Sequence, residues 1–322
     1  MATRPTPADL IPAREVERTG DDTPAASVFA YVWRMSGWHQ LAVCALAGAV
    51  AAISMAPLEL QRRIVNNAVG AADLSLLWWL GGVYAGVVAL QVGLKYALRV
   101  YQGWLGESAV RYTRGHLSGI FQDRVAREEE GGEGEAVSII GAEVEKLGGF
   151  VGEGPSQFVV NAGMLVAIIG YMVVVQPMIA MFGLAFIVPQ VVAAPLLQRW
   201  VNQLLKRRVE HLRRFGAMLT EEDDADETAL RGQLDRVFGN RMRIYLLKFA
   251  QKGFVGLMNA LAPLAALVFG GYMVIEGQTT IGVVVAFVSG FDKLADPVRE
   301  LVAWYRSAAQ ANVQHDMIAR WM

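Results

Sequence analysis

The chain has 322 residues, of which 54% are hydrophobic and only 18% are charged, and its mean hydropathy is +0.34. Soluble domains usually carry about 25% charged residues, so this balance indicates a membrane protein. The net charge of −1 argues against a nucleic-acid partner. The single cysteine, Cys44, excludes an intrachain disulfide, and its apolar neighbours favour a small buried hydrophobe.

The N-terminal region divides into a polar and an aromatic part. Residues 1–26 are polar and rich in proline, without the apolar core of a signal peptide, and we predict a disordered cytosolic tail. In residues 27–40, Phe29, Trp33 and Trp38 stand beside Arg34 and His39. This mixture predicts a short helix that lies at the membrane interface before the chain enters the bilayer.

One long stretch, residues 154–198, contains no Asp, Glu, Lys, Arg or His. As a single helix it would be about 67 Å long, roughly twice the thickness of the hydrocarbon core of a bilayer. Gln176-Pro177 lies near its middle, and proline disfavours a helical conformation in the residue before it. We therefore predict two spans joined by a tight turn at this dipeptide, with Pro189 and Pro195 as kinks inside the second span.

Apolar stretches elsewhere complete a prediction of six spans, each close to the length that a crossing needs. Of the 29 Lys and Arg residues, only Arg62 and Arg63 fall in loops on the side opposite the termini. Because cytoplasmic loops carry the excess of Lys and Arg, both termini are expected in the cytoplasm, in a bacterial inner or plasma membrane. The approximate spans are 41–60, 76–98, 155–175, 178–198, 254–275 and 277–297.

The two long cytosolic loops keep a helical pattern. Val137, Ile140, Val144, Leu147 and Val151 recur every three or four residues, with charged residues between them. This spacing is typical of an amphipathic helix. Both arms of the second loop have similar spacing, on either side of an acidic run at residues 221–227. We predict that the second to fifth spans continue into the cytosol as two helical hairpins with arms about 30–40 Å long.

This all-α arrangement resembles the transmembrane domain of ABC exporters over residues 27–322. VFAYVWRMSGWHQ (28–40) resembles the elbow helix, and GEAVSIIGAEVEKLGGFVGEG (134–154) resembles the entry to the third span. The closest match is GGYMVIEGQTTIGVVVAFVSGFDKLADPVREL (270–301), with Gly-x-x-x-Ala-Phe and Pro-x-Arg positions. AQANVQHDMIARWM (309–322) is similar to the end of the sixth helix. The order and spacing of these segments carry the resemblance.

The resemblance implies a dimer, with a second copy or a similar chain, and an ABC ATPase domain or subunit bound to the cytosolic arms. It places coupling at the basic segment VRYTRGH (110–116), at the end of the first arm, where an ordinary basic surface is the alternative. In the second loop the acidic run could contact a partner, or could be a solvated charge run or helix cap. The candidate coupling residues are Val110, Arg111, Tyr112, Thr113, Arg114, Glu222, Asp223 and Asp224.

Two features depart from the family. The chain contains no Gly-x-x-x-x-Gly-Lys-[Ser/Thr] phosphate loop, and LSGI at 117–120 is not the signature sequence of ABC ATPases. No cofactor is therefore expected on this chain, and ATP is expected on a partner or on a nucleotide-binding domain missing from it. The second loop is also shorter than in the family and lacks its Gly-Ile-x-x-Val-Lys stretch.

Polar residues inside spans are costly and therefore suggest function. Gln91, Asn161, Asn259 and Ser289 are candidates for the lining of a translocation cavity, with interhelical hydrogen bonding as the alternative. The Gly82-x-x-x-Gly86 motif favours close helix packing. Histidines 39, 116, 211 and 315 show no metal-ligand spacing, and no catalytic, cofactor-binding or metal-binding residue is expected.

The leading interpretation is the membrane subunit of an ATP-driven exporter that carries a small molecule, lipid or peptide. A non-transporting scaffold or regulatory subunit on the same fold is the alternative, favoured by the missing ATPase and the altered second loop. A secondary transporter fits poorly, because such proteins place paired ionisable residues at mid-membrane and these spans do not.

Overall fold

The computed structural model describes residues 11–16, 24–127, 133–220 and 227–322, and within these ranges all regular structure is helical. The expected all-α fold class is therefore confirmed. In chain order the elements are α1 (Val28–Ser36), α2 (Trp38–Ile53), α3 (Ala56–Arg63), η2 (Ile64–Val69), α4 (Leu74–Ala126), α5 (Glu133–Ser138), η3 (Ile139–Glu143), α6 (Val144–Val175), α7 (Pro177–Thr220), α8 (Glu227–Ile275) and α9 (Ile281–Trp321), where η2 and η3 are π-helices.

The chain forms two compact units. The first contains Met1–Tyr171 together with Leu294–Met322, and the second contains Met172–Lys293. Two helices, α6 and α9, therefore contribute residues to both units.

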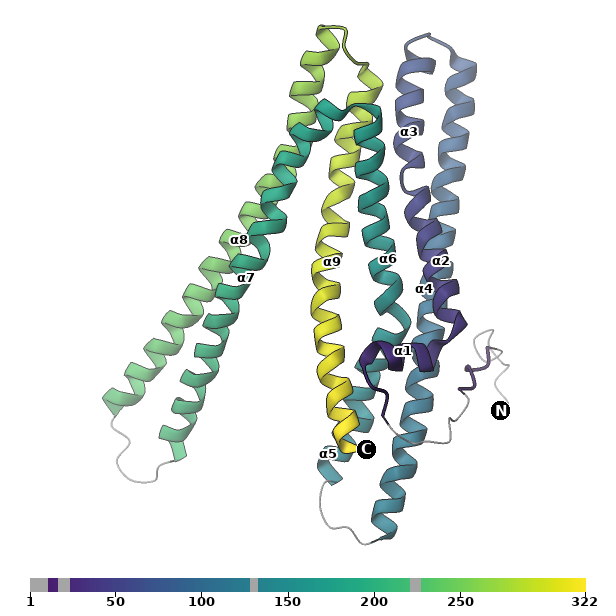
Figure 1. The fold of residues 1–322 in the computed structure, drawn as a ribbon. Helices are drawn as coiled ribbons and strands as arrows, with labels where there is room; N and C mark the ends of the chain where they lie inside the picture. Colours follow the sequence, from purple (N-terminus) through teal and green to yellow (C-terminus); the bar gives the residue numbers. More distant parts are fainter. Residues whose placement is uncertain (1–10, 17–23, 128–132, 221–226) are drawn as a thin grey trace, which may run out of the picture. The chain divides into compact units, whose positions relative to one another are not determined.

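In the first unit, the short helix α1 lies across the long helices (Figure 1). The Ser27 hydroxyl caps its first turn by accepting a hydrogen bond from the amide of Ala30 at 3.2 Å. Gly37, with φ +51°, ends it and lets the chain turn directly into α2. The short helix predicted for residues 27–40 is confirmed, although the structure assigns Trp38 and His39 to α2.

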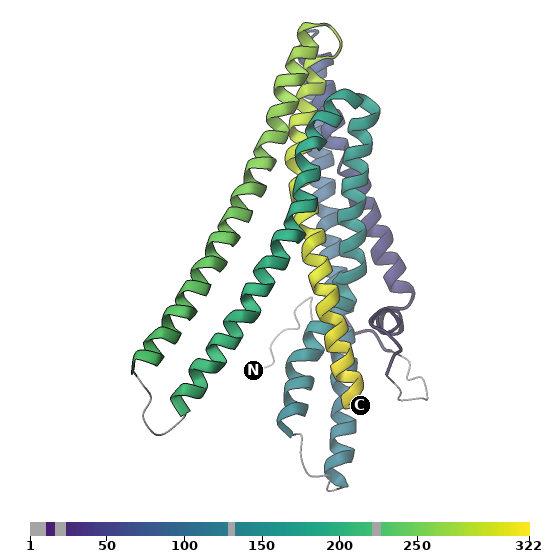
Figure 2. The ribbon, with the colours of Figure 1, turned by 60° about the vertical axis from the view of Figure 1, so that its left-hand side comes forward.

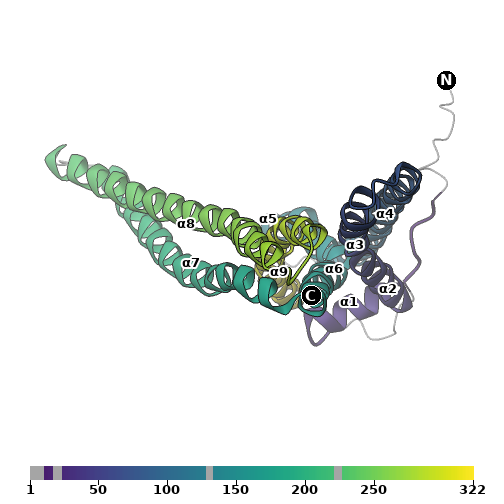
Figure 3. The ribbon, with the colours of Figure 1, turned by 90° about the horizontal axis from the view of Figure 1, so that it is seen from above.

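The longest helix, α4, has 53 residues and is therefore about 80 Å long. Asp73 caps it by accepting from the amide of Leu76 at 3.0 Å. Seen from above, α2 and α3 lie against α4 (Figure 3). A core of Val43, Ala47 and Val50 from α2, with Leu98 and Leu105 from α4, fixes that contact.

The predicted break at Gln176-Pro177 is confirmed, because α6 ends at Val175, Gln176 is not helical and α7 begins at Pro177. Pro189 and Pro195 both lie inside α7, which continues as one helix to Thr220. The predicted helical pattern of the two long loops is also confirmed by α5, η3 and the long extensions of α4, α6, α7 and α8. Most of the acidic run falls at 221–226, which, like residues 128–132 between the arms of the first hairpin, lies outside the described residues.

In the second unit, α7 and α8 run side by side (Figure 2). The amide of Asn240 on α8 donates to the carbonyl of Leu204 on α7 at 2.9 Å, and Gln233 donates to that of His211 at 2.8 Å. Phe182 and Phe269 pack with ring centroids 3.9 Å apart. These contacts join the two arms of the second predicted hairpin.

Four helices of the described chain are long and apolar enough to cross a membrane: Trp38–Val69, Leu74–Ala126, Ala136–Val175 and Leu230–Ile275. Pro177–Gln190 is a shorter apolar helix. These helices support the expected integral membrane protein, while the count of six spans stays a prediction.

The predicted disordered tail at 1–26 is described only in part, since residues 1–10 and 17–23 lie outside the described ranges. Residues 11–16 contact α1 and α4 within the first unit. The backbone amide of Arg14 donates to the Ser108 hydroxyl at 3.1 Å, and the indole of Trp104 donates to the Pro12 carbonyl at 2.9 Å. The Arg14 guanidinium donates to the carbonyl of Met35 in the last turn of α1, where a cation is favourable.

Candidate functional site

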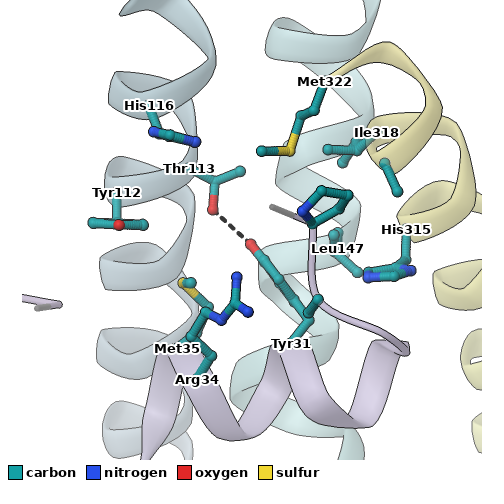
Figure 4. A pocket seen from close by; sticks show the side chains of 13 residues that line it. Tyr31, Arg34, Met35, Tyr112, Thr113, His116, Leu147, His315, Ile318 and Met322 are labelled. Atoms are coloured by element: carbon teal, nitrogen blue, oxygen red, sulfur yellow. Dashed lines mark hydrogen bonds between the residues drawn. The ribbon is translucent and has the colours of Figure 1, made fainter. Parts of the chain in front are cut away.

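The best-defined polar site surrounds the predicted coupling segment on α4, where α1, α6 and the end of α9 meet (Figure 4). An apolar core brings these four helices together. It contains Val28, Tyr31, Val32 and Met35 from α1, Ala109, Val110 and Leu117 from α4, Val144, Leu147, Phe150 and Val151 from α6, and Ala311, Ile318 and Trp321 from α9.

One buried hydrogen bond joins α1 to the coupling segment. The Tyr31 hydroxyl and the Thr113 hydroxyl lie 2.5 Å apart, and both side chains are buried (Figure 4). Burial raises the pKa of Tyr31 to about 12, because the apolar surroundings disfavour the phenolate, although the bond from Thr113 partly offsets this. Tyr31 is therefore a neutral partner at physiological pH, and the bond fixes α1 against α4.

A small pocket opens beside this bond. Its cavity volume is about 60 Å³, far below the roughly 300–1,000 Å³ of a site for a small organic ligand. Arg34, His116 and His315 are among its lining residues. The pocket can hold about two water molecules, so we interpret it as part of a helix junction.

The five predicted coupling residues of the first loop lie on different faces of α4. Val110 and Thr113 are buried in the junction, while Arg111 is exposed. Tyr112 is half-buried and stacks on His116, with ring centroids 6.3 Å apart. The segment therefore presents Arg111 outward and uses the other residues largely for packing within the chain.

Arg114 joins α4 to the π-helix η3. Its Nε donates to the carbonyl of Ile140 at 3.1 Å, and one terminal nitrogen donates to the carbonyl of Gly141 at 2.9 Å and to Glu145 at 3.0 Å. A π-helix interrupts the regular pairing of backbone groups, so a planar guanidinium with several donors suits its carbonyls. This side chain has a structural role between the two arms of the first hairpin.

The expectation that residues 110–116 lie at the end of the arm is wrong. Helix α4 continues beyond Arg114 for about three more turns, to Ala126. The pattern of Leu117, Phe121 and Val125 keeps one apolar face and continues the helix through this region. The acidic candidates Glu222, Asp223 and Asp224 lie outside the described residues.

Near the end of α4, Arg124 holds the last turn of α9. Its guanidinium carbon lies 4.9 Å from the ring centroid of Trp321, within cation–π range. The same side chain donates to the carbonyl oxygens of Trp321 at 2.7 Å and Met322 at 3.2 Å. Carbonyls in the last turn of a helix have no intrahelical donor, so Arg124 satisfies two of them. Sequence reasoning missed this contact, because the two residues are almost 200 positions apart.

Helices α4 and α6 approach each other closely at Gly106 and Gly152. A Cβ atom on Gly152 would lie 2.2 Å from the carbonyl oxygen of Gln102, and one on Gly106 would lie 3.1 Å from that of Gly148. Beside them the Gln102 amide donates to the buried Ser156 hydroxyl at 2.8 Å. By contrast, Gly82 and Gly86 have open space where their Cβ atoms would be, so the predicted packing motif makes no close contact with the described residues.

The four predicted cavity residues divide between the units. Asn161 on α6 is buried and donates to the carbonyl of Gln157 on its own helix at 2.8 Å, and Gln91 on α4 is half-buried. Asn259 on α8 and Ser289 on α9 are half-buried in the second unit. The Asn161 bond fits the alternative of local hydrogen bonding, and a cavity lined by all four stays a prediction.

The two arginines expected in an external loop end α3 instead. Arg62 and Arg63 donate to Glu59 over 2.6–2.8 Å, and the Tyr171 hydroxyl of α6 donates to the same carboxylate at 3.0 Å. The (i, i+3) and (i, i+4) spacing from Glu59 was visible in the sequence, but the partner on α6 was not.

Comparison with protein families finds a match, over residues 42–222, to the model described as the ABC transporter transmembrane region. Comparison with curated proteins finds no significant match. Among the described residues, no group of three or more His, Cys, Asp or Glu side chains could hold a metal ion.

Proposed function

The chain belongs to the family of ABC transporter transmembrane regions and is a membrane-spanning part of an ABC transporter, and we propose that it forms the translocation pathway of an ATP-driven exporter. In this proposal two copies, or this chain and a similar one, enclose the pathway. ABC ATPase domains or subunits bind the cytosolic arms, and ATP binding and hydrolysis drive the dimer between inward-open and outward-open states.

The length of the helices is the observation that carries this proposal. At about 80 Å, α4 is roughly twice as long as a bilayer including its headgroups is thick, so about half of it must project into water. The projecting half contains Arg111, Arg114 and Arg124, and the positive-inside rule directs it to the cytoplasm. The helices α7 and α8, with 44 and 49 residues, have the same excess length. Arms of this kind offer a cytosolic ATPase a surface far from the lipid.

Arg111 provides the test of ATPase docking. It is exposed on the projecting half of α4, and it makes no ion pair with another residue in the described part of the chain. A charge-assisted contact with an ATPase would contribute about 1.5–3 kcal/mol. Arg111→Glu should therefore reduce substrate-stimulated ATPase activity and transport of the reconstituted complex, while the thermal midpoint of the isolated chain stays within about 1 °C.

Arg114 requires a separate variant, because it already binds η3 and Glu145. Arg114→Gln should lower the thermal midpoint, so its loss of activity alone would not identify a docking contact. Normal ATPase stimulation and transport in Arg111→Glu would exclude docking at this segment. If the reconstituted wild-type chain with its ATPase transports nothing, the exporter function is refuted in favour of a scaffold.

A further inference from the structure

A second cavity lies within the first unit, between α6 and the end of α9. Its volume is about 390 Å³, within the range of sites that bind small organic molecules. Neither α6 nor α9 was predicted to carry a ligand site here. The lining residues are Lys146, Gly149, Phe150, Glu153, Gly154 and Gln157 from α6, and Glu300, Ala303, Trp304, Ser307, Gln310 and Gln314 from α9.

The lining residues recur at helical spacing on both helices, so two facing stripes form the cavity. The stripe on α9 carries carboxylate, hydroxyl and amide groups, which a helix packed only against apolar neighbours would not need. Gly149 on α6 has open space where a Cβ atom would be. The missing side chain therefore leaves room for a ligand rather than for a close helix contact.

The charges around the cavity leave one carboxylate without compensation. Among the described residues that line the cavity, Lys146 is the one cation, and its Nζ lies 3.1 Å from Glu143. Glu153 is exposed and lies 3.5 Å from Arg99. Glu300 is half-buried and accepts a hydrogen bond from the neutral amide of Gln157 at 3.2 Å. The cavity therefore keeps a net negative charge at Glu300, which favours a cation.

An aromatic ring stands one turn after Glu300. The Trp304 indole donates to the carbonyl of Gly154 at 2.6 Å, and Phe158 packs on the ring with centroids 4.8 Å apart. These two contacts fix the orientation of the indole. A cation beside an aromatic face and a carboxylate is attracted by both.

A mostly buried side chain adds a further polar group to the lining. Gln314 lines the same cavity and is only 3% exposed. Its oxygen can accept from, or orient its dipole toward, a positively charged group in the cavity.

We propose that this cavity binds an amphipathic organic cation, with Glu300 as its counter-charge and Trp304 against its apolar body. The binding itself is independent of transport. Only the further step, that such cations are the exported substrate, rests on the exporter function proposed above.

The test measures equilibrium binding of two probes to the purified full chain in mild detergent, without ATP or an ATPase. Tetraphenylphosphonium and tetraphenylborate have nearly the same shape and opposite charge. The proposal predicts saturable binding of the phosphonium and at least tenfold weaker binding of the borate. Glu300→Gln keeps the side-chain shape and the Gln157 contact, and should weaken phosphonium binding about tenfold. Trp304→Leu should weaken it about fivefold.

Two further variants make the test specific to the cavity. Ala303→Leu fills the space without changing a charge and should also weaken phosphonium binding. Asp296→Asn removes a carboxylate one turn before Glu300, where it is exposed and paired with Arg299 at 2.9 Å, and should leave binding unchanged. Each variant is compared with the wild type for its elution volume and thermal midpoint, so that unfolding is recognised.

Equal binding of the two probes, no binding of either, or equal losses in Asp296→Asn and Glu300→Gln would overturn the cation site. Saturable phosphonium binding without transport by the reconstituted complex would leave the cation site standing and contradict the exporter function alone. Transport of other compounds without phosphonium binding would support the exporter function and contradict the cation site.

Discussion

The contact between α4 and α6 should be the most sensitive to a single methyl group. In Gly152→Ala the new Cβ atom would lie 2.2 Å from the Gln102 carbonyl oxygen and 2.9 Å from the Gly106 nitrogen. Ordinary contacts at a Cβ atom begin above 3 Å, so the two backbones must separate by about 1 Å. Overpacking of this kind costs about 1–3 kcal/mol. It would also strain the buried bond from Gln102 to Ser156.

Gly149→Ala is the matched control, because it lies one turn earlier on α6 and its Cβ atom would meet nothing within 4 Å. Both variants gain the helix propensity of alanine, up to about 1 kcal/mol. Their difference therefore isolates the overpacking. At roughly 2–4 °C per kcal/mol, Gly152→Ala should unfold about 2–12 °C below Gly149→Ala at a fixed scan rate in detergent. Equal midpoints for the two variants would show that the helices do not approach closely at Gly152.

Three further predictions concern the junction around α1. Tyr31→Phe should cost about 1 kcal/mol at pH 8. The wild type loses this extra stability as pH rises from about 10 through the raised pKa of about 12, so the difference in thermal midpoint between wild type and Tyr31→Phe should be smaller at pH 11. A difference that does not change with pH would contradict the buried neutral phenol. Arg124→Gln should lower the thermal midpoint by more than Arg124→Lys, which keeps the charge but not the fork, and equal losses would show that the positive charge contributes nothing to the contact. Ser27→Ala should cost about 1 kcal/mol by loss of the α1 cap, whereas Ser27→Asp should restore it.

The helices could be predicted from the sequence because their signals are local. The break before Pro177 and the helical spacing from Val137 to Val151 depend on local residues, and both predictions agree with the structure, although Val137 is 70% exposed. The count of six spans, which rests on uncharged length, stays a prediction. The π-helices η2 and η3 were not predicted, since single extra residues in a helical turn leave no periodic signal over so short a length.

The roles of individual side chains depend on which helices meet, and this was the part that sequence reasoning could not supply. Arg111 and Arg114 looked equivalent in the basic segment, yet one is exposed and the other binds the carbonyls of η3. Gly82 and Gly86 have the motif spacing of close packing, but the close contact forms between Gly106 and Gly152, on different helices. A motif within one helix cannot report the position of its partner.

The contacts along α4 bear on how an ATPase could act on this chain. Thr113 bonds to α1, Arg114 to η3, and Arg124 to the end of α9, all within four turns of one helix. This stretch of α4 therefore contacts neighbouring elements on several sides. A displacement of α4 at its end, Ala126, would be transmitted to α1, α6 and α9 together. Docking at residues 110–116 is then not required for coupling. If Arg111→Glu is active while Arg124→Gln is folded and uncoupled, the force enters through the end of the arm and reaches α9 through Arg124.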